Sequence, residues 1–218
     1  MDPIFISSAI VILIFSIVIH EVMHGFIALK FGDRTAEKSG RLTLNPLPHI
    51  DPVGSVLLPL ILIGLPLISG APVRFFIAWA KPVPVNPLNF SDMKKGELFV
   101  SAAGILSNFS MAIIATILFH VLAPILGFSN IIIHLLSFTT TINLILGFFN
   151  LLPIPPLDGS RILTSQLPYN LAREYERIAP YGVFIILALL WLTPIFAIIL
   201  GGLLGLYSSI FSIPLRLF

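Results

Sequence analysis

The sequence predicts an all-α polytopic membrane protein with about five to six transmembrane helices and short membrane-associated extended segments. Of its 218 residues, 57% are hydrophobic and only 10% are charged, whereas soluble domains carry about 25% charged residues. Several apolar runs approach or exceed the roughly 20 helical residues that cross a bilayer core. The length suits a single membrane-embedded domain over residues 1–218, without an internal repeat or an added soluble domain.

The first predicted helix is the apolar run 4–29, which is long enough to span a membrane with some tilt. It is too long for a cleavable signal and lacks a basic lead, so we expect it to be retained. A polar stretch broken by glycine and proline follows over 30–51. Residues 53–69 are apolar but contain prolines, which favours either a spanning helix or a re-entrant segment. Residues 70–87 combine β-forming residues with prolines and are expected to be extended.

Two further long apolar helices are predicted over 96–128 and 131–152, and Ser91 is a candidate N-cap ahead of the first. Three prolines in "NLLPIPPLDGSRIL" stop the second of these helices. A short helix is then expected over 157–167. The apolar run 179–211 contains Pro194 in its middle, so it can cross the membrane once or twice.

The basic residues indicate an orientation. Ten of the twelve lie in three polar stretches: Lys30, Arg34, Lys38, Arg41, Lys81, Lys94, Lys95, Arg161, Arg173 and Arg177. If these stretches share one side, the positive-inside rule places that side in the cytoplasm. The net charge of +2 gives no indication of nucleic-acid binding, and the absence of cysteine excludes disulfides and thiolate metal ligands.

The stretch "HEVMH" at the end of the first apolar run places ionisable groups in a membrane-length helix, at roughly 2.5–3.5 kcal/mol each on insertion scales. His20 and His24 are one helical turn apart on the same face and can bind one ion. Glu21 lies beside them and can take a proton from a zinc-bound water, which is the chemistry of H-E-x-x-H helices. The alternative is a helix end at the interface, but the apolar run continues past His24.

A catalytic zinc site normally has a third protein ligand. We expect His120 and His134 to lie toward the opposite side and His49 to have a supporting polar role. On the topology above, we expect Asp158 to follow a returning helix and to lie at the same side of the membrane as His20. It is either the third ligand or the N-cap of a helix that begins at the next residue, and the residues alone leave both possibilities open.

Several segments together resemble the site-2 protease family of intramembrane zinc metalloproteases, in the order that the family has them. They are "HEVMHGFIALKFGD", "SGRLTLNPLPHIDPVGS", "AWAKPVPVNP", "SAAGILSN" and "FNLLPIPPLDGSRI". The arrangement is similar to the short prokaryotic branch without a PDZ domain. The resemblance implies one Zn²⁺ per chain held by His20, His24 and Asp158, with Glu21 as the general base.

The same resemblance implies that Asn150 helps to hold the substrate or the oxyanion, and it gives Asn108 a less defined polar role. Either asparagine can instead serve helix–helix hydrogen bonding. The implied function is hydrolysis of peptide bonds within or beside transmembrane segments of membrane-anchored proteins, as in regulated intramembrane proteolysis. The expected partners are such substrates and membrane lipid, without nucleic acid, and the oligomeric state is left open. The expected location is the cell membrane, with the active site toward the cytoplasm.

Other functions fit parts of the pattern. A zinc protease with a glutamate as third ligand would need a soluble catalytic domain, which the chain lacks room for. A transporter or metal-ion channel could use the histidines and an aspartate for permeation, and proline-broken segments are compatible with that. Glu21 beside the histidines is better explained by hydrolysis. If the chain is a protease, residues 40–46 and 73–85 are candidate edges for an unwound substrate strand.

Overall fold

Helices make up the regular structure of this computed structural model, which describes residues 3–57, 60–61 and 79–215 and contains no strand within them. Four segments are long and apolar enough to cross a membrane: Ile4–Lys30, Met93–Leu126, Ile131–Asn150 and Tyr169–Leu192. A shorter apolar helix covers Ile195–Phe211. The predicted all-α polytopic class is confirmed, with four to five apolar helices in the described part. Most of the expected re-entrant segment lies outside the described residues.

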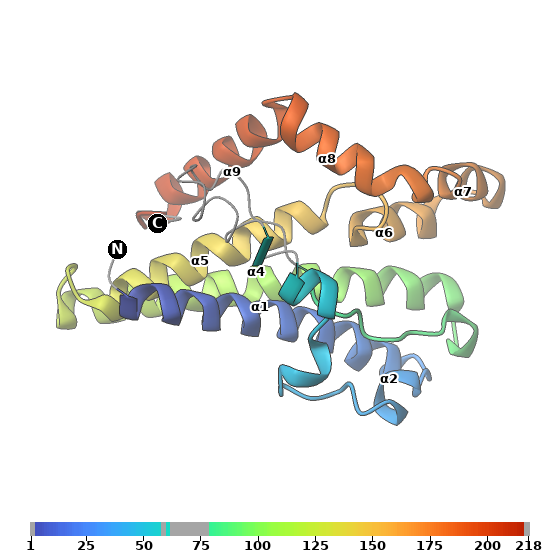
Figure 1. Ribbon diagram of the computed structural model, residues 1–218, viewed down its shortest axis with the longest axis horizontal. Helices are drawn as coiled ribbons and strands as arrows, with labels where there is room; N and C mark the ends of the chain where they lie inside the picture. Colours follow the sequence, from blue (N-terminus) through green and yellow to red (C-terminus); the bar gives the residue numbers. More distant parts are fainter. Residues whose placement is uncertain (1–2, 58–59, 62–78, 216–218) are drawn as a thin grey trace.

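Three helices lie side by side and form the body of the molecule: α1 (Pro3–Lys30), α4 (Met93–Leu126) and α5 (Ile131–Asn150). α4 packs against both others and runs antiparallel to them (Figure 1). Its buried face includes Gly104 and Ala112, and small residues let membrane helices approach closely. The helix starts at Met93, and the side chain of Asp92 caps it by accepting the N–H of Lys95 at 3.0 Å. The prediction of Ser91 as the N-cap is therefore wrong by one residue, since Asp92 occupies that position.

α5 ends part of the way along α4. Gly147, near its end, packs so close to Phe109 of α4 that an added Cβ would lie 2.6 Å from the phenyl ring. The prolines that follow cannot continue the helical hydrogen bonding, and the chain turns before α6 (Asp158–Gln166). α6 then packs against α4. The break in the helix therefore places the start of α6 inside the bundle, next to α1.

The C-terminal part continues through α7 (Tyr169–Glu176), the 3₁₀ turn η4 (Ala179–Tyr181), α8 (Gly182–Leu192) and α9 (Ile195–Phe211). The run 179–211, for which both one and two helices were open, forms two, because α8 ends at Leu192 and α9 begins at Ile195, after Pro194. Figure 1 shows α8 and α9 meeting at an angle above the three-helix body.

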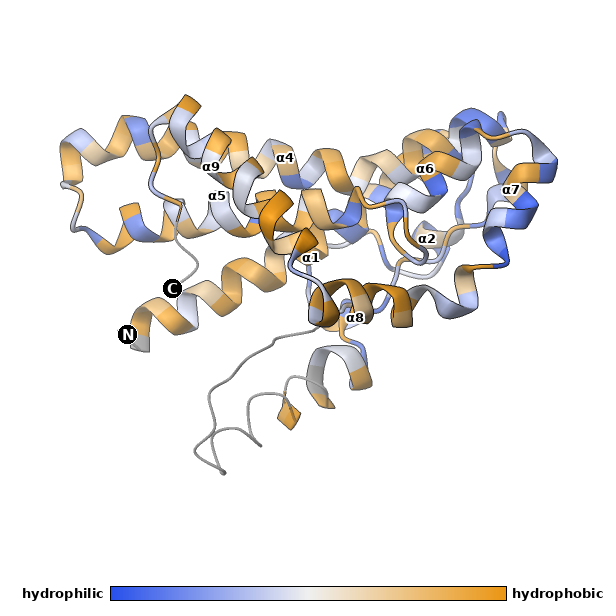
Figure 2. Cartoon of the chain, turned by 90° about the horizontal axis from the view of Figure 1, so that it is seen from above, coloured by the Kyte–Doolittle hydropathy of each residue, from blue (hydrophilic) through white to orange (hydrophobic). Residues whose placement is uncertain are grey.

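The polar parts of the chain gather at one end of the bundle. There α1 ends, α4 begins, and α2 (Thr35–Lys38), α6 and α7 lie nearby (Figure 1). Figure 2 shows that hydrophilic residues concentrate at this end, while the helices that extend away from it are mainly hydrophobic. We call it the polar end.

Asp33 ties two loops together at the polar end. Its side chain is fully buried and accepts hydrogen bonds from Thr35, from the N–H of Asn86 at 2.7 Å and from the side chain of Asn89 at 2.7 Å. Burial opposes the charged form, but these donors outweigh it and hold the pKa of Asp33 below its usual value. As a result, the extended segment before Asn86 is fastened alongside α1.

Candidate metal centre

His20, His24 and Asp158 meet in the interior although 134 positions separate His24 from Asp158. The Asp158 Oδ2 lies 3.1 Å from the His20 Nε2 and 3.2 Å from the His24 Nε2, and the two Nε2 atoms are 3.1 Å apart. Both histidines are less than a tenth exposed. Asp158 is the first residue of α6 and Leu157 occupies the N-cap position. The carboxylate thus faces the imidazoles.

Hydrogen bonds at the Nδ1 atoms, the nitrogens that face away from Asp158, orient both imidazoles. The His24 Nδ1 lies 2.7 Å from the backbone oxygen of Val100, which can only accept, so this nitrogen carries the proton. The His20 Nδ1 lies 2.7 Å from the Oδ1 of Asn108. With Nδ1 protonated, each Nε2 presents a lone pair. The close approach of the two Nε2 atoms is then a contact between two acceptors, not a hydrogen bond.

These atoms fit a zinc ion. The Oδ2 of Asp158 is buried without a hydrogen-bond partner, and it converges with two imidazole lone pairs. Three acceptors at such distances repel each other unless a cation lies between them. Zinc bonds of about 2.0–2.1 Å at tetrahedral angles put ligand atoms about 3.3 Å apart, close to the observed separations. Two histidines and one carboxylate also leave the fourth position open, as in catalytic sites.

Gly104 of α4 makes room for the two imidazoles. A Cβ on this residue would lie 2.5 Å from the His20 Cε1 and 2.5 Å from the His24 Nε2, closer than real contacts allow. Because α4 has no side chain at this position, its backbone can lie directly against the centre. The motif "SAAGILSN" pointed to this helix, but not to the glycine as the residue in contact with the histidines.

Glu21 lies beside the centre and is held from outside α1. Its Oε2 accepts the N–H of Val83 at 2.8 Å. Val83 lies between Pro82 and Pro84, which have no N–H, so it offers the sole backbone donor of residues 82–84. The sequence could show that this short stretch has one donor, but not that Glu21 is its acceptor.

The remaining predicted residues lie outside this cluster. The Asn150 side chain donates to the backbone oxygen of Leu146 at 3.0 Å, within its own helix. His49 is buried and its Nε2 lies 3.0 Å from the oxygen of Thr43, in keeping with a supporting polar role. His120 is bonded to the oxygen of Phe211. Within residues 3–57, 60–61 and 79–215, the His20–His24–Asp158 group is the one cluster with metal-ligand geometry.

Of the two candidate substrate edges, the structure describes residues 40–46 in full and residues 79–85 of the other. Within the described part of 73–85, the N–H of Trp79 donates to Gly54 and the N–H of Lys81 donates to His49. The oxygen of Lys81 accepts from the side chain of Arg41 at 2.6 Å. This backbone is thus already paired with its own chain, and neither it nor residues 40–46 form a strand.

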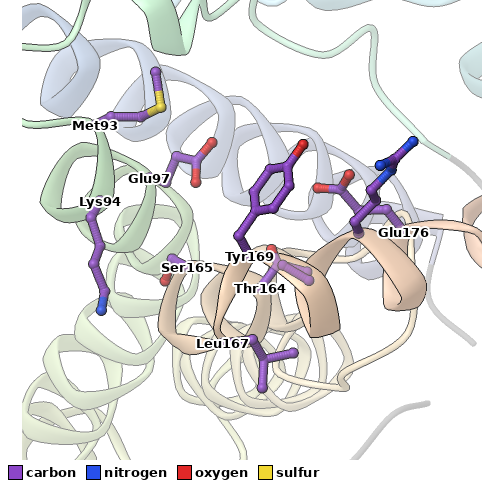
Figure 3. A pocket seen from close by; sticks show the side chains of 10 residues that line it. Met93, Lys94, Glu97, Thr164, Ser165, Leu167, Tyr169 and Glu176 are labelled. Atoms are coloured by element: carbon purple, nitrogen blue, oxygen red, sulfur yellow. The ribbon is translucent and has the colours of Figure 1, made fainter.

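A separate pocket of about 530 Å³ lies at the polar end, between the first turn of α4 and the α6–α7 region. Figure 3 shows Glu97 of α4 together with Tyr169 and Glu176 of α7 among its lining side chains. None of the predicted site residues lines this pocket, so it is distinct from the metal centre.

Comparison with known proteins supports the same assignment. The model of Peptidase family M50 matches residues 124–193. A protein of Bacillus subtilis named "Putative zinc metalloprotease YwhC" is 36% identical over 93% of this chain and 92% of its own length. "Putative zinc metalloprotease Rip2" of Mycolicibacterium smegmatis is 33% identical over 82% of this chain and 64% of its own length. No solved structure matches. The chain therefore belongs to peptidase family M50, the zinc-dependent, intramembrane-cleaving metalloproteases of the site-2 type.

Proposed function

We propose that this protein is an intramembrane endopeptidase that hydrolyses peptide bonds within or beside transmembrane segments of membrane-anchored proteins. His20, His24 and Asp158 hold one zinc ion, and Glu21 is the general base. The observation that carries the proposal is the convergence of three buried acceptor atoms from α1 and α6. His20 is ten residues from the end of α1, or about 15 Å along the helix axis, which is half of a hydrocarbon core of about 30 Å.

The residues of the chain have separate tasks in the reaction. Bound at this site, zinc supplies a Lewis acid that polarises a peptide carbonyl and activates water. Glu21 takes a proton from the water whose oxygen bonds to the carbonyl carbon. It then gives that proton to the amide nitrogen as the C–N bond breaks, leaving a carboxylate and an amine. The Val83 N–H holds one oxygen of Glu21 and leaves the other available for this proton.

The proposed location is the cell membrane, with the polar end toward the cytoplasm. The three stretches that hold ten of the twelve basic residues adjoin the end of α1, the start of α4, and α6 with α7. These elements share the polar end of the bundle (Figure 1). A cluster of Lys and Arg beside transmembrane helices favours the cytoplasmic side.

The test is cleavage of a membrane-anchored substrate by the protein in proteoliposomes, comparing wild type with Glu21→Gln. The variant keeps the size of the side chain but cannot take a proton, so we expect cleavage to fall by about 10²–10⁴-fold at unchanged zinc content. In parallel, Asp158→Ala should lose zinc, because it removes one of three ligands.

Two outcomes would overturn the proposal. One is equal cleavage by wild type and Glu21→Gln. The other is zinc-coupled ion flux through the same proteoliposomes that Glu21→Gln leaves unchanged, which would favour the transporter alternative. Full zinc occupancy in Asp158→Ala would show that the third ligand is a different residue.

A further inference from the structure

A chain of buried polar side chains runs from His20 through three helices and back to α1. The His20 Nδ1 lies 2.7 Å from the Asn108 Oδ1 on α4. The Asn108 Nδ2 donates to the Asn143 Oδ1 on α5 at 2.9 Å, and the Asn143 Nδ2 donates to the Ser16 Oγ on α1 at 3.0 Å. Asn108 and Asn143 are fully buried and Ser16 is 2% exposed. Buried amides without partners are unfavourable, and these form one continuous network.

The direction of every hydrogen bond in this chain is set by one backbone oxygen. The Asn143 side chain lies 2.9 Å from the oxygen of Thr139, which can only accept, so its nitrogen must face that oxygen. Its Oδ1 then faces Asn108 and must accept from the Asn108 nitrogen. That leaves the Asn108 Oδ1 facing His20, so His20 must donate from Nδ1.

This order of donors fixes His20 in the tautomer that a metal ligand needs. With the proton on Nδ1, the Nε2 of His20 has a lone pair free for the ion that it would share with the Asp158 oxygen. The network also closes on α1, because Ser16 is one turn before His20 on the same face. It therefore resists rotation of α1 against α4 and α5. His24 has no such dependence, since a backbone oxygen holds its Nδ1.

We infer that Asn143, acting through Asn108, is a positioning residue that sets the tautomer and orientation of His20 as a zinc ligand. The inference rests on the proposed ligand role of His20. Outer partners of this kind typically change metal affinity by about 10–100-fold when removed. Asn143 belongs to none of the segments that carry the family resemblance, and it lies 123 positions after His20 in the sequence.

The experiment measures zinc affinity of the full-length protein in detergent by competition with a chelator, and the visible spectrum of the cobalt-substituted form. Asn143→Leu keeps the size of the side chain but leaves Asn108 free to turn its nitrogen toward His20. We expect its zinc affinity to fall about tenfold or more, with a changed cobalt spectrum. Asn108→Leu should lose at least as much.

Thr116→Val is the matched control. Thr116 is also buried on α4, and its hydroxyl joins Thr140 of α5 and Tyr207 of α9. It lies two turns from Asn108 and outside the network. Its isosteric replacement removes a buried interhelical hydrogen bond without touching His20, so zinc affinity and the cobalt spectrum should not change.

The inference is overturned if Asn143→Leu binds zinc like wild type, or if Thr116→Val loses as much affinity as Asn143→Leu. Should Asn143→Leu fail to fold, Asn143→Ala still decides, because it removes the amide oxygen that accepts from Asn108 without adding an apolar side chain. We expect about a tenfold loss of zinc affinity there as well, and wild-type affinity would contradict the inference. His20→Ala distinguishes failure of this inference from failure of the proposed function. If His20→Ala still binds zinc like wild type, His20 is not a ligand and the proposed function fails as well. If His20→Ala loses zinc but Asn143→Leu does not, only the role of Asn143 is refuted.

Discussion

At the scale of single residues, the metal centre is specified by which atoms are already occupied. Each imidazole has its Nδ1 engaged, His24 by a backbone oxygen and His20 by Asn108. Asp158 keeps one oxygen without a hydrogen-bond donor. The atoms that remain are the three that converge. A site of this kind depends as much on the residues that leave space and hold protons as on the ligands.

Gly104→Ala tests the space that the centre requires. The added Cβ would lie 2.5 Å from both imidazoles, and their Nδ1 hydrogen bonds keep them from moving aside. We expect zinc affinity to fall by about tenfold or more, as for other changes that displace ligands. The measurement is zinc content after dialysis against a chelator.

Gly147→Ala is the control for this substitution. It also creates a close contact inside the bundle, at 2.6 Å from the ring of Phe109, but none with a ligand. It should lower the temperature of thermal unfolding and leave zinc affinity unchanged. Equal zinc affinities in Gly104→Ala and wild type would show that the imidazoles can move without loss of the site.

At the scale of elements, the extended segment over 79–86 connects the polar end to Glu21. Asp33 holds its end at Asn86, Arg41 holds Lys81, and Val83 contacts the proposed general base. An element without regular secondary structure is thus fixed by side chains from α1 and from the loops that follow it. We propose that its role is to position Glu21.

Val83→Pro isolates the contribution of one backbone N–H. The residue lies between two prolines in a stretch without regular secondary structure. A residue before a proline favours the extended or polyproline II backbone, so a third proline suits this position and removes the donor. We expect kcat to fall about 10–100-fold, because a displaced catalytic group can lose that much, with KM and zinc content unchanged. Val83→Ala retains the N–H and should cleave at nearly the rate of wild type. Wild-type kcat in Val83→Pro would mean that Glu21 is positioned without this hydrogen bond.

The anchoring of the same segment should depend on pH through Asp33. The folded protein lowers the pKa of this carboxyl below its ordinary value of 3.8. Its stabilising effect is therefore fully present above pH 3.8 and is lost as the pH falls through the lowered value. We expect the protection factor of the Asn86 N–H against hydrogen exchange to fall over that acidic range.

In Asp33→Asn, the Asn86 N–H should be less protected at neutral pH, and its protection should no longer depend on pH. The exposed Glu37→Gln should behave like wild type. An Asn86 N–H that exchanges at the same rate in Asp33→Asn would refute the anchoring role.

The sequence was sufficient to predict the elements with long apolar runs and the two motif histidines that the structure brings together with Asp158. Apolar runs and the prolines between them located α1, α4 and α5 to within a few residues. The contact of Val83 with Glu21 and the network through Asn143 could not be predicted. Each joins residues more than 30 positions apart, and nothing in the local pattern shows which donor meets which acceptor. The cap of α4 was misplaced because Ser91 and Asp92 are both good caps.

At the scale of the whole molecule, hydrophilic residues are distributed unequally between the two ends of the bundle, which favours one orientation in the membrane. The hydrophilic residues are concentrated at the polar end (Figure 2). The turn between α4 and α5 lies at the other end of these helices. A membrane potential and the insertion machinery both act on such asymmetry. In the proposed orientation, water and substrate would reach the centre from the cytoplasmic side. The centre would lie at a depth of about half of the bilayer core.

Cysteine labelling can test this orientation directly, because the chain contains no cysteine and an introduced one is therefore the single thiol. Ser39, after α2 at the polar end, and Ser129, between α4 and α5, are both exposed and differ from cysteine by one atom. In intact cells, a membrane-impermeant maleimide should label Ser129→Cys and not Ser39→Cys. After the cells are opened, both should react. Labelling of Ser39→Cys in intact cells would place the polar end outside, and the metal centre would then have to receive water and substrate from the external face.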